Sequence, residues 1–325
     1  MRVVITGGGG FLGQKLARRL LDKGTLAGPD GRQTEIGELI LFDQVTPRPI
    51  ADRRVRGIPG DVADAKQIAN LITPATASIF HLASVVSAGA EADFDLGYRV
   101  NLDGTRNVLE AARATSAKPR LVFTSSIATY GGGLPDVVTD ETPQRPETSY
   151  GTQKAIGEAL VNDYSRKGFI DGRSVRLPTI TIRPGKPNKA ASTWASSIMR
   201  EPLQGEDAIC PVTPETPMAC LGPRRCVENL IRVHEVAAEA LGSHRSTLLT
   251  GIPVTAGEME KALHRNAGNR KLGRVIWQHD PDIQRIVDGW PKATRSDKAA
   301  KLGMEVQPDV DTMIREFIED ELTTG

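Results

Sequence analysis

Four consecutive glycines between a strand pattern and a helix pattern constrain this chain more than any other feature. The β-branched run Arg2–Thr6 precedes Gly7–Gly10, and Leu12, Leu16 and Leu20 then recur at helical spacing. A glycine loop in this position lets backbone N–H groups surround a phosphate at the positive end of the helix dipole. The chain therefore opens with a strand–loop–helix unit suited to an anionic ligand.

Strand and helix patterns alternate through the first half of the chain. The expected strands are Arg2–Thr6, Glu38–Asp43, Val55–Gly60, Ser78–Ala83, Arg120–Ser125 and Ser174–Thr179. The segments between them allow right-handed helical crossovers, so the alternation predicts an α/β fold of the Rossmann type with a doubly wound parallel sheet. Residues 24–37 hold a Gly-Pro-Asp-Gly turn signal, and we expect a surface excursion there.

The composition of the sequence changes after about residue 183, where prolines become too frequent for helical crossovers. We expect residues 1–183 to form the nucleotide-binding domain. Residues 184–223 and 251–325 are expected to form a smaller C-terminal substrate-binding lobe. The helical pattern at 224–241 is expected to rejoin the nucleotide-binding domain within about 224–250, and further helices are expected at 256–267 and 310–322.

Charge and cysteine content exclude several classes of partner and site. Lys plus Arg (41) nearly balance Asp plus Glu (40), so no whole-molecule field would attract nucleic acid or an anionic membrane. Cys210, Cys220 and Cys226 contain no C-x-x-C pair, which predicts neither a disulfide framework nor a metal site. No apolar run approaches the roughly 18 residues of a membrane span. We expect a cytoplasmic protein with a small-molecule substrate.

The glycine loop and the second strand together predict the cofactor. Gly7 permits a tight turn, Gly10 allows the backbone to approach a pyrophosphate, and Gly13 permits close packing of helix and strand. Asp43 ends the second strand, where its carboxylate can accept hydrogen bonds from both ribose hydroxyls and would repel a 2′-phosphate. The predicted cofactor is therefore NAD rather than NADP.

A tyrosine and a lysine one helical turn apart form the catalytic candidate. In Tyr150-Gly151-Thr152-Gln153-Lys154 the phenol and the ammonium share one helix face. A free phenol has a pKa of about 10, and a nearby lysine and a cationic nicotinamide ring both favour the phenolate needed as a base. Ser125 and Ser126 end the fifth strand, where one serine can hold a substrate hydroxyl and the other can satisfy backbone groups.

These motifs together resemble the extended short-chain dehydrogenases/reductases, of the NAD-dependent epimerase/dehydratase superfamily. The resemblance spans about the first 185 residues and is carried by Thr6–Gly13 (T-G-x-x-G-x-x-G), Gly60-Asp61, His81-Leu82-Ala83, Asn101 with Gly104-Thr105, Ser126 ahead of Tyr130-Gly131, and Tyr150 with Lys154. It implies a homodimer in which the helices near Asn101 and Tyr150 pair.

The resemblance also implies individual roles. Asp61 and Val62 would flank the adenine, and Lys154 would bind the nicotinamide ribose as well as acting with Tyr150. Counting back from Tyr130-Gly131 makes Ser126 the catalytic serine, with Ser125 as second choice. His81 would be a packed strand-end residue rather than a base or metal ligand. The remaining expected cofactor contacts are Phe11, Leu12, Ala83 and Asn101.

The second half departs from the nucleotide-sugar enzymes that make up most of this superfamily. Ile127-Ala128 replaces the carboxylate pair that dehydratases need beside the catalytic serine, so dehydration is not expected. The run 177–189 and the run 222–226 resemble the D-erythronate dehydrogenases, which oxidise a four-carbon 2-hydroxy acid. Basic side chains suit a carboxylate substrate. The expected substrate contacts are Ser125, Ser126, Tyr150, Arg183, Lys186, Asn188, Lys189 and Arg224.

The resulting hypothesis is oxidation of D-erythronate to 2-oxo-D-erythronate, with Tyr150 phenolate taking the 2-hydroxyl proton as hydride leaves C2. Each basic residue could equally be solvated surface or could face a UDP diphosphate. Two alternatives therefore stay open. One is a nucleotide-diphosphate-sugar 4-epimerase, which would use the same residues. The other is a dinucleotide-sensing regulator, against which the intact Tyr150 and Lys154 argue.

Overall fold

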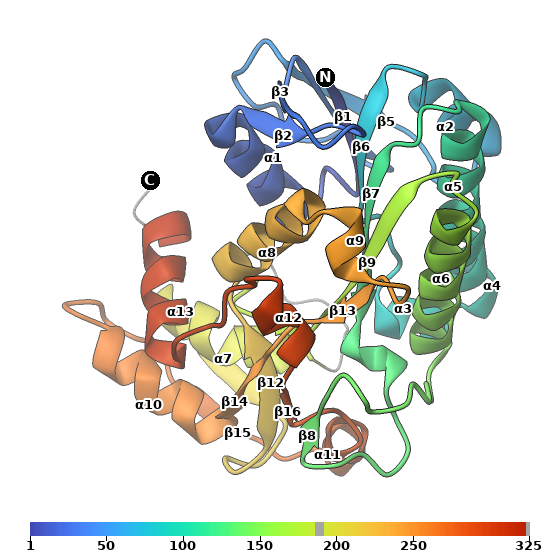
Figure 1. Ribbon diagram of the computed structural model, residues 1–325. Coiled ribbons are helices and arrows are strands. Elements are labelled where there is room, and N and C mark those ends of the chain that lie inside the picture. The colour runs from blue at the N-terminus through green and yellow to red at the C-terminus, as the bar shows by residue number, and fades with distance from the viewer. Residues whose placement is uncertain (186–191, 323–325) are drawn as a thin grey trace.

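The computed structural model describes residues 1–185 and 192–322 (Figure 1). A central sheet has the strand order β13-β9-β7-β6-β1-β4-β5, and every neighbouring pair is parallel. Its strands are β1 (Arg2–Thr6), β4 (Glu38–Asp43), β5 (Val55–Pro59), β6 (Thr76–His81), β7 (Arg120–Ser126), β9 (Asp171–Leu177) and β13 (Ser246–Leu248). The predicted Rossmann-type, doubly wound fold is confirmed.

Helices cover both faces of this sheet (Figure 1). Strand side chains alternate between the faces: Val3 and Ile5 pack in one core with Leu16 of α1, whereas Val4 packs in another with Val108 of α5. Burial on both faces explains why the strands read as continuous apolar runs. The helices are α1 (Phe11–Lys23) and α8 (Pro223–Glu235) on the first face, and α2 (Ala65–Leu71), α5 (Gly104–Ala114) and α6 (Ser149–Arg166) on the second.

The expected surface excursion at 24–37 is wrong in part. Strands β2 (Thr25–Ala27) and β3 (Gln33–Glu35) form an antiparallel hairpin, and Leu26 and Ile36 are fully buried in the core beside α1. The turn, strand β3 and Gly37 are exposed. The expected strand at 174–179 is also displaced, because β9 starts at Asp171 and ends before Pro178, which lacks a backbone N–H donor.

The chain after β9 forms most of a second lobe, which is the lower part of Figure 1. Strands β10 (Thr179–Ile180), β12 (Pro217–Leu221) and β14 (Ile252–Thr255) form a small mixed sheet. Helices α7 (Thr193–Leu203), α10 (Ala256–Asn266) and α13 (Val310–Phe317) pack on it around an apolar core of their own. Between these segments the chain returns to the main sheet through α8 and β13.

Shorter elements complete the described chain. They are α3 (Ser87–Ala92), α4 (Phe94–Gly97), β8 (Val137–Val138), β11 (Ala208–Cys210), α9 (Ala238–Leu241), β15 (Val275–Trp277), α11 (Pro281–Asp288), β16 (Ala293–Thr294) and α12 (Asp297–Lys301), with π-helical turns at Tyr98–Asp103 and Ile318–Leu322 and a 3₁₀ turn at Ile127–Thr129. Within the part of the chain that the structure describes, none of the helices combines the length and apolarity needed to span a bilayer.

Candidate active site

Two glycines where β1 joins α1, Gly7 in the loop and Gly13 in the first turn of the helix, have no room for a side chain. Gly7 adopts a left-handed φ of +73°, and a Cβ there would lie 2.7 Å from the backbone nitrogen of Ala83. A Cβ on Gly13 would lie 2.3 Å from the carbonyl oxygen of Gly7. Gly10 precedes α1 and supplies no side-chain cap, so the first N–H groups of the helix stay available for a ligand. These residues fit a dinucleotide pyrophosphate.

The acidic residues expected at the adenosine end follow strands β4 and β5. Asp43 ends β4, and its Oδ2 accepts a hydrogen bond of 2.9 Å from the Gly9 N–H, which fixes the carboxylate beside the loop. Asp61 forms an ion pair of 2.7 Å with Arg99, a contact that the sequence did not suggest. Val62 is buried against Gly104 of α5. The structure thus brings these residues to the edge of the sheet next to the glycine loop.

The side-chain amide of Asn101 makes four hydrogen bonds, one of which its Nδ2 donates to the Val85 carbonyl (3.0 Å). Its Oδ1 accepts hydrogen bonds from the Val85 N–H (2.8 Å) and the Ser84 hydroxyl (2.9 Å), and its Nδ2 donates to Gln153 Oε1 (2.7 Å). Asn101 itself is buried. Its amide therefore positions the segment after β6, and its predicted contact with the cofactor stays a prediction.

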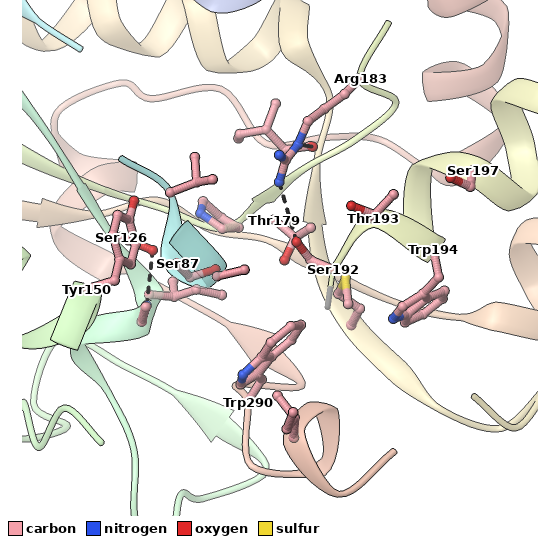
Figure 2. A pocket seen from close by; sticks show the side chains of 18 of the residues that line it. Ser87, Ser126, Tyr150, Thr179, Arg183, Ser192, Thr193, Trp194, Ser197 and Trp290 are labelled. Atoms are coloured by element: carbon pink, nitrogen blue, oxygen red, sulfur yellow. Dashed lines mark hydrogen bonds between the residues drawn. The ribbon is translucent and has the colours of Figure 1, made fainter. Parts of the chain in front are cut away.

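Close packing of helix α6 sets the position of Tyr150. The Thr148 hydroxyl caps the helix by accepting a hydrogen bond of 3.0 Å from the Gly151 N–H. A Cβ on Gly151 would lie 2.0 Å from the carbonyl oxygen of Ala128, so only glycine lets the helix touch the turn that follows β7. That contact carries Tyr150 to the side of Ser126 (Figure 2).

The two serines at the end of β7 have different partners. The Ser125 hydroxyl donates to the buried carboxylate of Glu158. The Ser126 hydroxyl accepts a hydrogen bond from the Ala128 N–H (3.1 Å) and hydrogen bonds to the Tyr150 phenol. Ser126 is therefore the serine that faces the tyrosine, because consecutive strand residues point to opposite faces.

Burial dominates the acid–base properties of the catalytic pair. It raises the pKa of Tyr150, while hydrogen bonds with Ser126 and Ser84 and the charge of Arg183 oppose that rise. It also lowers the pKa of Lys154 to about 7, against the charge of Glu158. Lys154 Nζ donates to the Thr124 carbonyl (2.8 Å) and lies 5.6 Å from the Tyr150 ring centroid. The sequence predicted that a lysine and a nicotinamide ring favour the phenolate, and the structure adds the charge of Arg183 to these.

His81 is packed at the end of β6, as the resemblance implied. Its Nδ1 shares a hydrogen bond of 2.6 Å with the Thr6 hydroxyl, and its Nε2 shares one of 3.0 Å with the Thr105 hydroxyl. Burial, and then the charge of Lys154, lower the pKa of His81 to about 3. The neutral ring ties β1, β6 and α5 together behind the site.

One large cavity, of about 1660 Å³, extends from the glycine loop to the second lobe. Its lining includes Tyr150, Ser126 and Arg183, and Figure 2 shows Trp290 and α7 on the wall opposite Tyr150. Arg183 follows β10, and its guanidinium contacts the Ser192 hydroxyl (3.5 Å) and the Ile180 carbonyl (3.3 Å). A guanidinium, a phenol and a serine hydroxyl therefore line one cavity.

Other expected substrate contacts lie elsewhere. Lys186, Asn188 and Lys189 fall outside the described residues. Arg224, at the start of α8, pairs with Asp320 and with Glu319 (3.0 Å) and lines a small separate hollow. Arg224 is therefore not among the residues that line the cavity with Tyr150 and Ser126.

Ser84 and Trp290 were not recognised from the sequence. Ser84 directly follows the His81-Leu82-Ala83 motif, and this adjacency is the sequence signal that could have identified it as a site residue. Trp290 follows α11 at a point where the sequence has no site motif, and only the folded second lobe brings it to the cavity.

The model of the NAD dependent epimerase/dehydratase family matches residues 3–216. The chain belongs to this family. It is 51% identical over 320 residues to a D-erythronate dehydrogenase of Cupriavidus necator, with 98% of each chain covered. It is 45% identical over 320 residues to a D-erythronate dehydrogenase of Haemophilus influenzae, with 98% of this chain and 99% of that protein covered. The resemblance drawn from the motifs is confirmed, and the cofactor is NAD.

Solved structures share the complete fold. A nucleoside-diphosphate-sugar epimerase from Agrobacterium tumefaciens superimposes with a TM-score of 0.93 at 39% identity, covering 100% of this chain and 95% of that one. L-threonine 3-dehydrogenase from Trypanosoma brucei gives a TM-score of 0.82 at 25% identity, covering 98% and 96% of the respective chains. The same architecture thus occurs in proteins named for epimerisation and for oxidation.

Proposed function

We propose that this protein oxidises D-erythronate at C2 to 2-oxo-D-erythronate. The observation that carries the proposal is the position of Arg183, whose guanidinium enters the cavity that also holds Tyr150 and Ser126. A 2-hydroxy acid presents a carboxylate next to the reacting hydroxyl, and an arginine beside a tyrosine base matches that pair of groups. The full-length similarity to two D-erythronate dehydrogenases supports the same substrate.

The side chains divide the work of the reaction. Bound NAD supplies the hydride acceptor, held by the glycine loop, Asp43 and Lys154. Ser126 orients the 2-hydroxyl group by a hydrogen bond, and Tyr150 phenolate removes its proton as the C2–H bond breaks. Arg183 holds the substrate carboxylate and favours the phenolate by its charge. Walls of apolar side chains limit water around these charges and so strengthen their interactions.

A nucleotide-diphosphate-sugar 4-epimerase remains the second candidate, because a protein of that description shares this fold at 39% identity. Such an enzyme would use Tyr150 and Ser126 on a sugar hydroxyl, with Arg183 facing a diphosphate. The two candidates differ in their products. An epimerase regenerates its oxidised cofactor in each cycle, whereas a dehydrogenase releases NADH.

In the experiment, purified enzyme and NAD are mixed in parallel with D-erythronate, L-threonate or UDP-galactose. The NADH concentration is followed over time until it reaches equilibrium. NADH formation with D-erythronate alone is the expected result. Conversion of UDP-galactose without net NADH, and no reaction with either acid, would refute the proposal in favour of epimerisation.

The role of Arg183 is tested with a matched pair of variants. Arg183→Met is expected to raise KM for D-erythronate by about 10²-fold, because a bidentate charged contact contributes roughly 1.5–3 kcal/mol. Arg224→Met serves as the control, since Arg224 is bound to acidic residues away from the cavity. Equal effects of the two substitutions on KM would contradict the assignment.

We also propose that the protein is a cytoplasmic homodimer. Helices α5 and α6 lie side by side on one face of the sheet (Figure 1), and the exposed Phe94 ring packs at a tilt of 32° against Tyr98 next to them. Exposed aromatic surface beside a paired helix layer suits a subunit contact. Light scattering coupled to size exclusion should give the dimer mass, and Phe94→Glu should shift it toward the monomer.

A further inference from the structure

A buried carboxylate lies behind the catalytic pair on the same helix. Glu158 follows Tyr150 by eight residues and Lys154 by four, so the three side chains share one face of α6. Glu158 is only 4% exposed. Four groups from other elements converge on this region, and the proposed mechanism gives Glu158 no role.

The partners of Glu158 come from strands β7 and β9 and from the loop before α6. Ser125 donates its hydroxyl hydrogen to Oε1. Arg176 binds the carboxylate in a bidentate way, with Nε 3.0 Å from both oxygens and Nη2 2.7 Å from Oε2. Gln144 Nε2 donates to Oε2 at 3.2 Å. A fully hydrogen-bonded buried ion pair of this kind holds its geometry tightly.

Arg176 is itself held from the other side. Its Nη1 donates to the Tyr130 hydroxyl at 2.7 Å, and its guanidinium carbon lies 5.4 Å from the centroid of the Tyr130 ring. The partners of Arg176 raise its pKa further, so the guanidinium stays charged. The charge of Glu158 is therefore partly balanced by Arg176, which comes from β9, whereas Lys154 lies on α6.

The charged surroundings of Lys154 are few. On its own helix, Lys154 faces Tyr150 and Glu158. On β7, its Nζ contacts the Thr124 carbonyl and lies 4.8 Å from the centroid of the Phe123 ring. On β6, it faces the neutral His81. Arg183 faces Tyr150 from the second lobe. Glu158 is thus the anion that favours the charged form of Lys154 against burial.

We propose that Glu158, neutralised in part by Arg176, is a positioning residue that keeps Lys154 charged and fixes Ser125, and so sets the pH range over which the Tyr150–Lys154 pair works. The inference rests on the proposed function only for its kinetic readout. Full neutralisation of Glu158 would leave Lys154 uncharged near neutral pH, and an unbalanced Glu158 would keep Lys154 charged at higher pH. The ion pair holds the lysine between these limits.

Two single variants test the proposal because their effects have opposite signs. Glu158→Gln removes the anion, and the alkaline limb of the kcat/KM profile should move down by about one pH unit. Arg176→Gln leaves the anion unbalanced, and the same limb should move up by a comparable amount. The acid and alkaline limbs both report on the coupled Tyr150–Lys154 pair, so the complete kcat/KM profile is fitted for each variant.

Control variants distinguish an effect of the Glu158 charge on the pH profile from an effect on folding. Glu158→Asp keeps the charge, so its profile should stay near that of the wild type even if kcat falls. Asp171→Asn removes a carboxylate that pairs with the fully buried Arg173 at the far end of β9, and it should leave both limbs unchanged. If a single variant does not fold, the double variant Glu158→Gln, Arg176→Gln should still lower the alkaline limb.

A second readout is independent of the substrate. Nitrogen-15 NMR of labelled lysine side chains, with Lys154 assigned from Lys154→Met, should show the same opposite shifts in the titration of Lys154. Shifts of one sign in both single variants, or no shift in either, would overturn the role of Glu158. Absence of NADH formation from D-erythronate in the wild type, with the NMR shifts intact, would overturn the proposed substrate alone.

Discussion

Replacement of Gly13 by alanine should damage the nucleotide loop through a collision between backbone atoms and a new methyl group. The Cβ would lie 2.3 Å from the Gly7 carbonyl oxygen and 2.8 Å from the Gly8 Cα, whereas ordinary contact begins at 3.4 Å. Neither neighbour is a side chain that can rotate away, so α1 or the loop must shift by about 1 Å. Overpacking of this size costs roughly 1–3 kcal/mol of unfolding free energy.

Gly10→Ala is the matched comparison within the same loop. Its Cβ would meet only the Gly7 carbonyl oxygen, at 3.3 Å, which a small adjustment relieves. The methyl group would instead stand where the loop backbone approaches the pyrophosphate. We therefore expect Gly13→Ala to lower Tm by roughly 2–6 °C. Gly10→Ala should keep Tm but raise the Kd for NADH by about tenfold, equivalent to one lost hydrogen bond to a charged group.

Thermal denaturation without cofactor measures the first effect, and fluorescence titration with NADH measures the second. For Gly13→Ala both quantities should change, because the displaced loop also binds the cofactor less well. A Gly13→Ala protein with the Tm and NADH affinity of the wild type would refute the described packing of loop against helix. A large fall in Tm for Gly10→Ala would refute the distinction between the two glycines.

Three further substitutions test separate parts of the molecule. Tyr150→Phe should reduce kcat by about 10²–10⁴-fold with NADH binding nearly intact; preserved turnover would exclude a tyrosine base. Asp43→Asn should lower the preference for NAD over NADP by about tenfold, measured as a ratio of kcat/KM values. Although burial opposes it, hydrogen bonds from His234, the Ala27 N–H and Gln33 lower the pKa of Glu235 to about 2, below its ordinary 4.5. Glu235 therefore stabilises the fold above pH 4.5 by at most about 3 kcal/mol, and this contribution is lost as the pH falls toward 2. Glu235→Gln should flatten the acid branch of a plot of the urea unfolding free energy against pH.

The nucleotide-binding half could be predicted because its constraints are local in sequence. A glycine loop between a strand and a helix, and strands buried on both faces, leave few alternatives to a parallel sheet. The hairpin at 25–35 was missed because its strands have three residues each, too short for a period to show among turn-forming residues. Leu26 is buried only through packing on α1 and α8, which tertiary structure decides.

The candidate site was predictable in its motifs but not in its contacts. Tyr150 and Lys154 share a helix face whatever the fold. Both serines bind side chains of α6, and only the folded chain shows that Ser126 lies beside Tyr150 while Ser125 binds Glu158. The same applies to the cations of the second lobe. Arg183 and Arg224 look alike in sequence, and only the folded chain shows one in the cavity and the other paired with Asp320. The domain bounds at 183 and 223 remain predictions.

The two halves of the protein contribute differently to its chemistry. Gly151 packs against the turn after Ser126, and Glu158 is bound to β7 and β9. Tyr150 and Ser126 therefore lie on one closely packed unit of the nucleotide-binding half. Arg183 comes from the segment after β10, which pairs with β12 of the second lobe. Since oxidation and epimerisation share the closely packed unit, the choice of substrate must lie in the second lobe. An exchange of residues in that lobe between relatives should therefore change KM and substrate preference while the pH profile set by Glu158 and Lys154 is retained.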